Sequence, residues 1–249
     1  MRKASRPLRS IFGAGVRRLF EDQTERGARL LQWVRGREIW VHREVRCARL
    51  RLGVGDGEWC VCPESLSEQS LVYSFGVGKD ISFDLQLIER FGVEVHAFDP
   101  TPISADWMRR QHPPPRFHFH PFGIAGYDGV AEFSLPLHHG VSFTLLSDVP
   151  SKRTAQGDVY RLSTILEKLN HKRINLLKLD IEGAEYEVIP QLVELAGRID
   201  QLLIEFHHRL VTTGDGLKQT RNALKQLHEY GFALFNVSPR GLEYSFVRR

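Results

Sequence analysis

The stretch Leu71-Val-Tyr-Ser-Phe-Gly-Val-Gly-Lys-Asp80 joins a short apolar run to two glycines that stand two residues apart. An apolar run of this length, bounded by glycine, is typical of a buried strand in a parallel sheet. Residues 80–91 follow with Ile81, Leu85 and Ile88 on one helical face, which predicts a helix directly after the glycines. Strand, glycine turn and helix in this order predict the first unit of a doubly wound α/β fold.

Apolar runs alternate with helical stretches along the rest of the chain, which predicts a parallel sheet with crossover helices. Further strands are expected at residues 93–98, 116–122, 174–179 and 201–206. One helix is expected after the strand at 93–98 and ends at about residue 111. The other helices are expected at residues 162–169, 182–196 and 216–230. Residues 130–160 predict only a short strand in an irregular insertion. The last two runs, 232–237 and 242–247, predict an antiparallel hairpin. The predicted fold class is therefore α/β: a doubly wound, mostly parallel sheet of seven strands with a C-terminal antiparallel hairpin.

The region before this sheet differs in character and divides into two parts. Residues 1–36 form a basic segment, and residues 37–70 are expected to form a small β-hairpin extension. In that extension, apolar runs at 38–52 and 58–62 flank an Asp-Gly turn. Residues 71–249 then form the main domain.

The net charge of +4 is unevenly divided along the sequence. Residues 1–60 carry 14 Lys and Arg against 7 Asp and Glu, whereas residues 61–249 carry 20 against 23. The basic excess lies outside the predicted sheet, which argues against a nucleic-acid partner. Two interpretations of the basic segment stay open: a solvated tail, or a weak contact with an anionic membrane surface.

The three cysteines favour a reducing compartment, because an odd number in a chain of 249 residues does not suggest a disulfide framework. No window approaches the ~20 apolar residues that span a bilayer. The basic start also lacks the long apolar core of a secretory signal. We therefore expect a cytoplasmic protein.

Polar residues and glycines gather where the first two strands end, and ligands of doubly wound sheets bind at such ends. Gly76 and Gly78 allow a tight turn, and the helix after them directs backbone N–H groups toward a ligand. Asp99 ends the second strand at about the spacing expected of an acid that binds ribose hydroxyls. These features predict an adenosine cofactor, either NAD or S-adenosylmethionine, although Ile81 in place of a third glycine disfavours a dinucleotide. Asp80 either caps the helix or contacts a ligand amine.

Carboxylates and imidazoles follow two later strands. Lys178 and Asp180 share one face at the end of the fourth strand, and Glu182 follows at its mouth. The fifth strand ends in Glu205-Phe-His207-His208, and histidine suits proton transfer near neutral pH. The expected catalytic residues are Asp180, Glu182 and His207, in this order, with helix-capping acids and a structural histidine as the alternatives.

Four segments resemble a known family: Tyr73-Ser-Phe-Gly-Val-Gly-Lys-Asp80, Val95-His-Ala-Phe-Asp-Pro100, Leu162-Ser-Thr-Ile-Leu166 and Leu177-Lys-Leu-Asp-Ile-Glu-Gly-Ala-Glu-Tyr-Glu187. Over about residues 58–208 the chain resembles the FkbM-type methyltransferases, most specifically in the last segment. The resemblance implies a class I methyltransferase fold with S-adenosylmethionine as cofactor. It also implies methylation of a hydroxyl oxygen on a sugar or secondary metabolite. The cofactor-binding residues expected from these segments are Phe75, Gly76, Gly78, Asp80, Phe98, Asp99 and Asp180.

The chain departs from that family at Ser74-Phe75, where many members carry an acid before the glycine loop. Asp80 or Asp180 is then expected to hold the amino end of the cofactor. Mg²⁺ at the carboxylates of the fourth strand is an option without a defined ligand set. His118-Phe-His120 and His138-His139 lack the ordered spacing of a zinc site, so no metal site is predicted.

Two other functional classes stay open. A nicotinamide-dependent oxidoreductase is opposed by Ile81 and by the acids after the fourth strand. A non-catalytic cofactor-binding or scaffold domain would dock through the basic segment. For an enzyme, the expected partner is a small-molecule or glycan acceptor, selected by residues 123–160 and by the N-terminal region.

Overall fold

The computed structural model describes residues 27–136 except 28, 32 and 37, together with residues 151–208 and 215–249. Most of the predicted basic segment, and the pair His138-His139, lie outside the described residues. Within the described part of the chain, no helix is long and apolar enough to cross a membrane.

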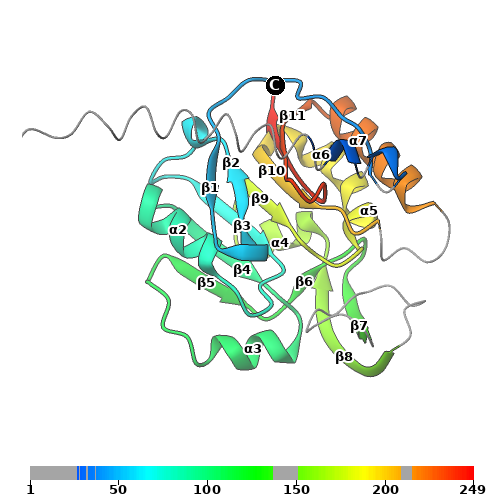
Figure 1. The fold of residues 1–249 in the computed structure, drawn as a ribbon. Coiled ribbons are helices and arrows are strands. Elements are labelled where there is room, and N and C mark those ends of the chain that lie inside the picture. Colours follow the sequence, from blue (N-terminus) through cyan, green and yellow to red (C-terminus); the bar gives the residue numbers. More distant parts are fainter. Residues whose placement is uncertain (1–26, 28, 32, 37, 137–150, 209–214) are drawn as a thin grey trace, which may run out of the picture.

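A seven-stranded sheet forms the centre of the molecule, as the sequence predicts (Figure 1). Its strands lie in the order β11-β12-β10-β9-β3-β4-β5. Their bounds are β3 (Leu71–Phe75), β4 (Glu94–Phe98), β5 (Phe117–His120), β9 (Ile174–Leu179), β10 (Ile199–Glu205), β11 (Phe232–Val237) and β12 (Glu243–Arg248). β12 is antiparallel to both of its neighbours, and the other adjacent pairs are parallel. The strand order reverses direction between β3 and β9, so the carboxyl ends of these two strands mark the place where a ligand is expected.

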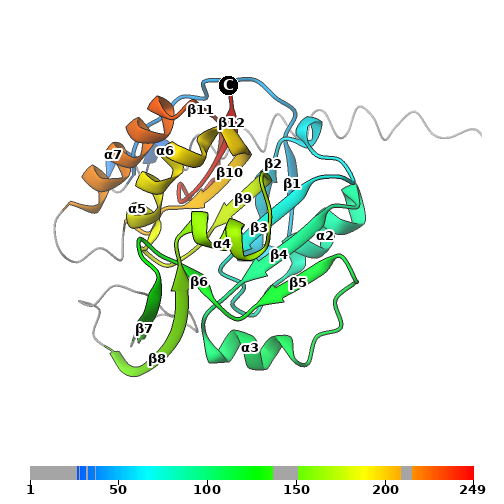
Figure 2. The ribbon, with the colours of Figure 1, turned by 180° about the vertical axis from the view of Figure 1, so that it is seen from behind.

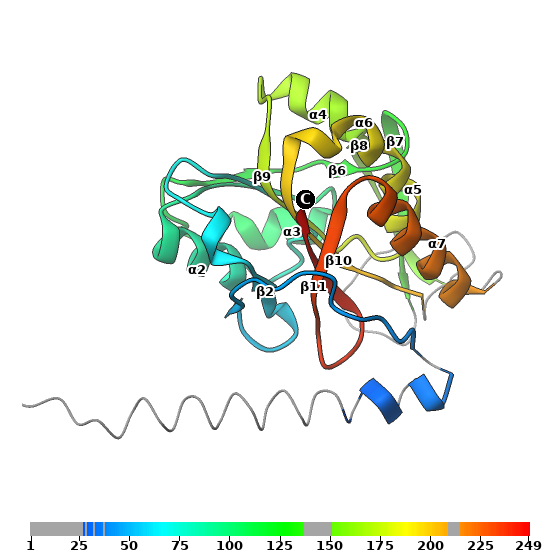
Figure 3. The ribbon, with the colours of Figure 1, turned by 90° about the horizontal axis from the view of Figure 1, so that it is seen from above.

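Helices cover both faces of this sheet (Figures 1 and 2). They are α2 (Ser82–Phe91), α3 (Pro102–Met108), α4 (Leu162–Lys168), α5 (Glu185–Val188), α6 (Leu192–Leu195) and α7 (Gly216–Glu229). One apolar core joins α4 to α7 with alternate strand residues such as Tyr73 and Leu177. A second core, on the other face, joins α2 and α3 with Val72 and Leu176. Figure 3 shows α7 beside β11, which it contacts at the edge of the sheet.

The predicted helix over residues 182–196 is instead four short pieces. After α5 come a 3-10 turn η3 (Ile189–Gln191), α6 and a second 3-10 turn η4 (Ala196–Arg198). Pro190 explains the break, because proline lacks the N–H that an uninterrupted helix would use and clashes with the preceding turn.

The predicted strand over residues 38–52 is also wrong for most of its length. Only β1 (Leu50–Leu52) pairs, with β2 (Trp59–Val61), and the 3-10 turn η1 (Gly55–Gly57) joins them. A further 3-10 turn, η2 (Pro63–Ser65), follows β2. The residues before β1 lie beside β11, the edge strand of the central sheet. There the N–H of Glu44 donates to the carbonyl oxygen of Leu234, and the N–H of Leu234 donates to the carboxylate of Glu44. The alternating pattern of residues 38–52 therefore reflects contact with the central sheet and does not mark a regular strand.

The insertion after β5 is more regular than predicted. β7 (Gly129–Pro136) and β8 (Ser151–Tyr160) are antiparallel, and the short β6 (Gly123–Ile124) pairs with β8 to give a three-stranded sheet. The sequence of β8 is largely polar, so the apolar alternation that identifies a strand is weak there. At Gly157, an added Cβ would lie 2.4 Å from the carbonyl oxygen of Pro100, which shows how closely β8 passes the loop after β4.

Candidate active site

A cavity of about 420 Å³ opens at the carboxyl ends of β3, β4, β9 and β10. The structure brings every predicted site residue to its wall: Phe75, Gly76, Gly78, Asp80, Phe98, Asp99, Asp180, Glu182 and His207. Segments more than 130 residues apart in the sequence thus meet at one place, as the doubly wound topology requires.

The glycine loop between β3 and α2 crosses the floor of the cavity. Gly76 has a φ of +85°, and a Cβ added to it would lie 1.8 Å from the carbonyl oxygen of Asp180. Gly78 also has a positive φ, of +53°, and its N–H donates to Oδ2 of Asp99 at 2.9 Å. The loop is therefore held against the ends of both neighbouring strands, and only glycine fits the first of these positions.

Asp99 is the acid that the sequence assigns to ribose, and it is 5% exposed. Its Oδ1 accepts from the N–H of Thr101 at 2.9 Å and from Oγ1 of Thr101 at 2.6 Å. With the bond from Gly78, three of about four acceptor positions on the carboxylate are used. One position remains for a ligand hydroxyl, and the other three hydrogen bonds fix the carboxylate in place.

Asp80 lies at the rim with its Oδ1 accepting from the N–H of Ser82, 2.7 Å away, in the first turn of α2. This bond satisfies the first free N–H group of α2, although the N-cap position is Ile81, so Asp80 supports the start of the helix from one residue further out. Its other carboxylate oxygen lies against Gly57 of the β1–β2 connection, where an added Cβ would be 2.3 Å from it. The extension before the sheet thus contributes to the cavity.

Lys178 supports the glycine loop from below, a role that sequence reasoning does not assign. The buried ammonium group donates to the carbonyl oxygens of Phe75 and Gly76, both at 3.3 Å. It also lies 3.6 Å from Oδ2 of Asp180 and 5.0 Å from the ring centroid of Trp59. Because two backbone carbonyls and a carboxylate share this one cation, its position fixes that of the loop.

Asp84, at the start of α2, is a second buried group in the cavity wall that sequence reasoning misses. Burial raises the pKa of its carboxyl to about 6, although Lys178 and a hydrogen bond with Ser74 oppose the shift. Among the described residues, its Oδ1 has no hydrogen-bond partner. A buried acceptor of this kind is costly unless a ligand or water satisfies it.

The turn after β9 is organised by Glu185, whose side chain is fully buried. Its carboxylate accepts from the N–H groups of Ile181 at 3.0 Å and Gly183 at 3.0 Å. These bonds hold Glu182 in a left-handed conformation, with a φ of +53°, and turn it toward the cavity. The Glu-Gly-Ala-Glu sequence therefore specifies the turn through its last residue.

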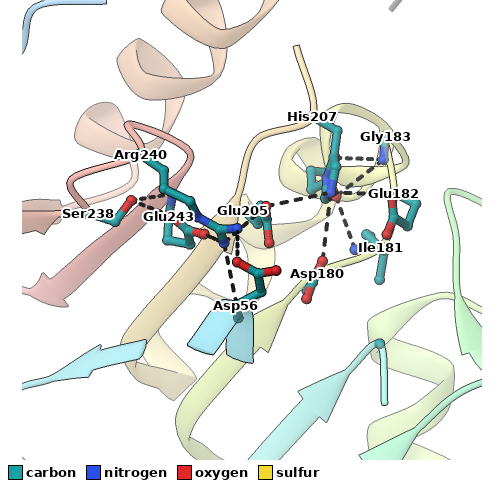
Figure 4. Close-up of polar contacts among 12 residues, drawn as sticks. Asp56, Asp180, Ile181, Glu182, Gly183, Glu205, His207, Ser238, Arg240 and Glu243 are labelled. Carbon is teal, nitrogen blue, oxygen red and sulfur yellow. Dashed lines mark hydrogen bonds and ion pairs between the residues drawn. The ribbon is translucent and has the colours of Figure 1, made fainter. Parts of the chain in front are cut away.

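His207 lies at the centre of a group of carboxylates (Figure 4). Its Nδ1 is 2.9 Å from Oε1 of Glu185, and its Nε2 is 3.4 Å from Oε2 of Glu182 and 3.8 Å from Oδ1 of Asp180. Burial alone would lower the pKa of His207, but these three carboxylates raise it well above 6.5. His207 is therefore protonated at neutral pH, which favours a neighbouring carboxylate over His207 as a base.

Glu205 is the carboxylate that sequence reasoning passes over. Ile204 of β10 pairs with Leu179 of β9, so the next residues, Glu205 and Asp180, leave the sheet side by side. Burial and the charge of Asp180 raise the pKa of Glu205 to about 7, although His207 and Arg240 lower it. A carboxylate that titrates near neutral pH is suited to proton transfer.

Arg240 closes this side of the cavity from the turn between β11 and β12 (Figure 4). Its guanidinium contacts Glu243, lies 3.8 Å from Oε1 of Glu205, and reaches Oδ1 of Asp56 at 2.8 Å. Asp56 belongs to η1, so the hairpins at the two ends of the described chain meet at the rim.

Asp180, Glu205 and His207 also offer one ligand atom each within 4.8 Å of one another, which is the spacing of a cation site. The protonated His207 already supplies positive charge at this point. A proton on His207 and an Mg²⁺ ion are alternative ways to balance the charge of these carboxylates, so the Mg²⁺ option stays open.

Comparison with known proteins identifies what this chain is similar to. A family model described as a methyltransferase domain matches residues 40–247. The probable methyltransferase-like protein 24 of Homo sapiens is 28% identical over 195 residues, which cover 72% of this chain and 47% of the human protein. Its counterpart from Rattus norvegicus is 27% identical over 72% of this chain and 48% of the rat protein. The chain thus spans about half the length of these curated relatives.

Among solved structures, the chain is similar to the fibrillarin of Aeropyrum pernix, crystallised with natively bound S-adenosyl-L-methionine. The TM-score is 0.41 and the sequence identity is 9%, over 74% of this chain and 68% of the fibrillarin.

Proposed function

Because this chain belongs to the methyltransferase-domain family that its residues 40–247 match, we propose that it methylates a hydroxyl oxygen of a small-molecule or glycan acceptor. S-adenosylmethionine is the methyl donor. The observation that carries the proposal is the meeting, in one cavity, of the glycine loop, Asp99 and a carboxylate that titrates near pH 7. The family match also supports methyl transfer over the nicotinamide-dependent alternative.

The residues around the glycine loop fit an adenosine cofactor. Asp99 keeps one acceptor position for a ribose hydroxyl, and nothing lies within 4 Å of the place where a Cβ of Gly78 would stand, so a ligand can approach the loop closely there. Phe75 and Phe98 stack with centroids 4.4 Å apart and line the cavity below the loop. Asp84 and Asp180 offer carboxylates for the amino group that the family's usual acid would hold.

The bound cofactor supplies an already activated sulfonium methyl group, so the protein has to align the acceptor and remove its proton. Glu205 accepts that proton, because its pKa of about 7 leaves a large ionised fraction at neutral pH while keeping the carboxylate basic. Asp180, beside Glu205, orients the acceptor hydroxyl. The protonated His207 stabilises the negative charges of the Asp180 and Glu205 carboxylates. Glu182 completes the polar wall around His207.

The charged residues at the rim of the cavity favour an acceptor that carries hydroxyl groups. On this side of the cavity Glu182, Glu205, Arg240 and Asp56 present charged groups rather than an apolar wall. Such groups bind the hydroxyls of a sugar or a polar secondary metabolite, whereas a planar apolar acceptor would leave them without partners. The FkbM-type resemblance leads to the same acceptor class.

The test is calorimetric titration of S-adenosylmethionine and of NAD into the purified chain and into Asp99→Asn. We expect the wild type to bind S-adenosylmethionine and not NAD, and Asp99→Asn to bind it at least about tenfold more weakly, since a charge-assisted hydrogen bond is lost. Asp106→Asn, at an exposed position of α3, is the matched control and should bind as the wild type does.

A screen of hydroxylated acceptors with methyl-labelled cofactor then tests the reaction itself. Labelled product on a sugar or polyol that is lost in Glu205→Gln supports the proposal. Tight cofactor binding without turnover on any acceptor would favour the non-catalytic alternative, and binding of NAD would oppose methyl transfer.

A further inference from the structure

A second group of titratable side chains lies on one face of the sheet, outside the lining of the methyl-transfer cavity. It comprises Glu94 and His96 of β4, His118 and His120 of β5, and His171, three residues after α4. The described lining of the cavity includes none of these five residues. The proposed reaction therefore leaves this histidine cluster without a role.

The fold assembles the cluster from separate short motifs. Glu94 and His96 stand two residues apart on β4, so their side chains share one face. His96 pairs with His118 in the parallel register of β4 and β5, which places the two imidazoles side by side. The ligands thus come from two neighbouring strands, which is why no metal-site spacing is visible along the sequence.

The distances within the cluster match those between the ligands of one ion. Glu94, His96 and His118 each offer a ligand atom, and these atoms all lie within 4.8 Å of one another. Nε2 of His118 contacts Oε1 of Glu94, and the rings of His96 and His118 stack with centroids 4.8 Å apart. Two imidazoles and one carboxylate form a donor set typical of zinc.

Neighbouring side chains form hydrogen bonds with the imidazole rings of the cluster, as the residues around the ligands of a metal ion do. Nδ1 of His96 lies 2.9 Å from Nε2 of His120, and Nδ1 of His171 lies 2.7 Å from the hydroxyl of Tyr73. Hydrogen bonds of this kind fix the tautomer and the direction of a ligating imidazole. The ring of His171 meets that of His96 edge-on at 4.7 Å, so it closes the cluster on a third side.

The exposure of the cluster also suits an ion that enters from solvent. The side chains of Glu94 and His118 are 39% and 40% exposed, so the cluster is open on one side.

We propose that Glu94, His96 and His118 bind one divalent transition-metal ion of the zinc class, with His120 and His171 as the groups that position the ligand rings. The ion joins β5, the edge strand of the sheet, to β4. The site is separate from the methyl-transfer cavity, so the proposal stands independently of the acceptor and of the reaction.

The test uses untagged protein freed of metal with a chelator, because a polyhistidine tag would itself bind the ion. Zn²⁺ is titrated into the wild type, His118→Ala and Glu94→Gln by calorimetry, and Co²⁺ is titrated with detection of its visible absorption. We expect one ion per chain in the wild type and affinity at least about tenfold lower in each variant. His112→Ala removes an exposed histidine before β5 and should bind as the wild type does.

Thermal unfolding with and without Zn²⁺ provides the second readout, because an ion bound to the folded chain raises its melting temperature. We expect the rise in the wild type and in His112→Ala, and its loss in Glu94→Gln, whose near-isosteric change preserves packing. Wild-type binding that persists in both ligand variants overturns the proposal. So does binding lost in Glu205→Gln instead, since that result moves the ion to the active-site cavity, and so does an absence of Zn²⁺ binding by the wild type.

Discussion

Glu205 and His207 show how two residues that leave one strand take opposite charge states. His207 stays protonated among Glu185, Glu182 and Asp180, whereas Glu205 is held near the point of half-ionisation by burial and by Asp180. Neither state follows from residue type, because both depend on which carboxylates the turn after β9 brings near. A base and its supporting cation are thus made from side chains only two positions apart.

Replacing Glu205 with Gln should lower kcat by about 10²- to 10⁴-fold, because the acceptor hydroxyl loses its base. In the wild type, kcat should rise as pH increases through about 7, since Glu205 accepts a proton only after losing its own. This rise should be absent in Glu205→Gln, as pH profiles of labelled-methyl transfer would reveal.

Glu58→Gln, which alters an exposed carboxylate that is not part of the cavity lining, is the control and should keep the wild-type profile. A Glu205→Gln enzyme with unchanged kcat would instead assign proton removal to Asp180 or Glu182.

The site residues at the carboxyl ends of the strands can be predicted from the sequence, because the topology of a parallel sheet alone brings those ends together. All nine residues that the sequence assigns to the site, from Phe75 to His207, line the cavity. Sequence reasoning misses Glu205, Lys178 and Asp84, whose importance depends on register, burial and the path of the backbone. No pattern along the chain reports those three quantities.

At the scale of elements, the apolar strands are predicted to within a few residues, and β3 and β9 have the predicted bounds. Buried parallel strands are readable because nearly every position in them is apolar. The errors fall where another interaction overrides the local pattern: Pro190 divides the helix after β9, and residues before β1 pack on Leu234 without pairing as a strand.

The turn between β3 and α2 contains two glycines with positive φ, Gly76 and Gly78, whose surroundings differ. Gly76→Ala should lower the free energy of unfolding by at least about 2 kcal/mol, since its Cβ meets the backbone of Asp180. Gly78→Ala should cost about 1 kcal/mol, because its Cβ meets nothing within 4 Å and only the left-handed conformation is penalised.

Urea denaturation of both variants measures the difference. Equal losses would show that the loop moves away from β9 to accept a side chain, and the close approach of the loop to Asp180 would then not be a requirement of the fold.

At the scale of the whole molecule, the hairpin β1–β2 belongs to the same apolar core as the sheet. Trp59 is 1% exposed and packs with α2 and the buried strands, with its ring under Lys178. The cavity wall also includes Asp56 and Gly57 from this hairpin. The extension is therefore expected to fold together with the sheet.

Trp59→Ala should lower the free energy of unfolding by about 3–5 kcal/mol, as for other large aromatic residues removed from a core. Trp40→Ala, at a position 38% exposed, should cost under about 1 kcal/mol. A single cooperative transition is expected in both. If Trp59→Ala unfolded in two steps, with the sheet melting as the wild type does, the hairpin would be an independent unit.

The order of the strands has a consequence for how the protein is made. β12 is synthesised after β11 but lies between β11 and β10, and its turn carries Arg240 to the rim of the cavity. A chain emerging from the ribosome can pair β3, β4, β9 and β10 while the place beside β10 stays vacant. Glu205 then lacks its arginine neighbour, and the exposed edge of β10 offers unpaired backbone groups to other chains. A nascent chain in which β12 has not yet paired is therefore expected to expose the edge of β10 and to lack the completed rim of the cavity.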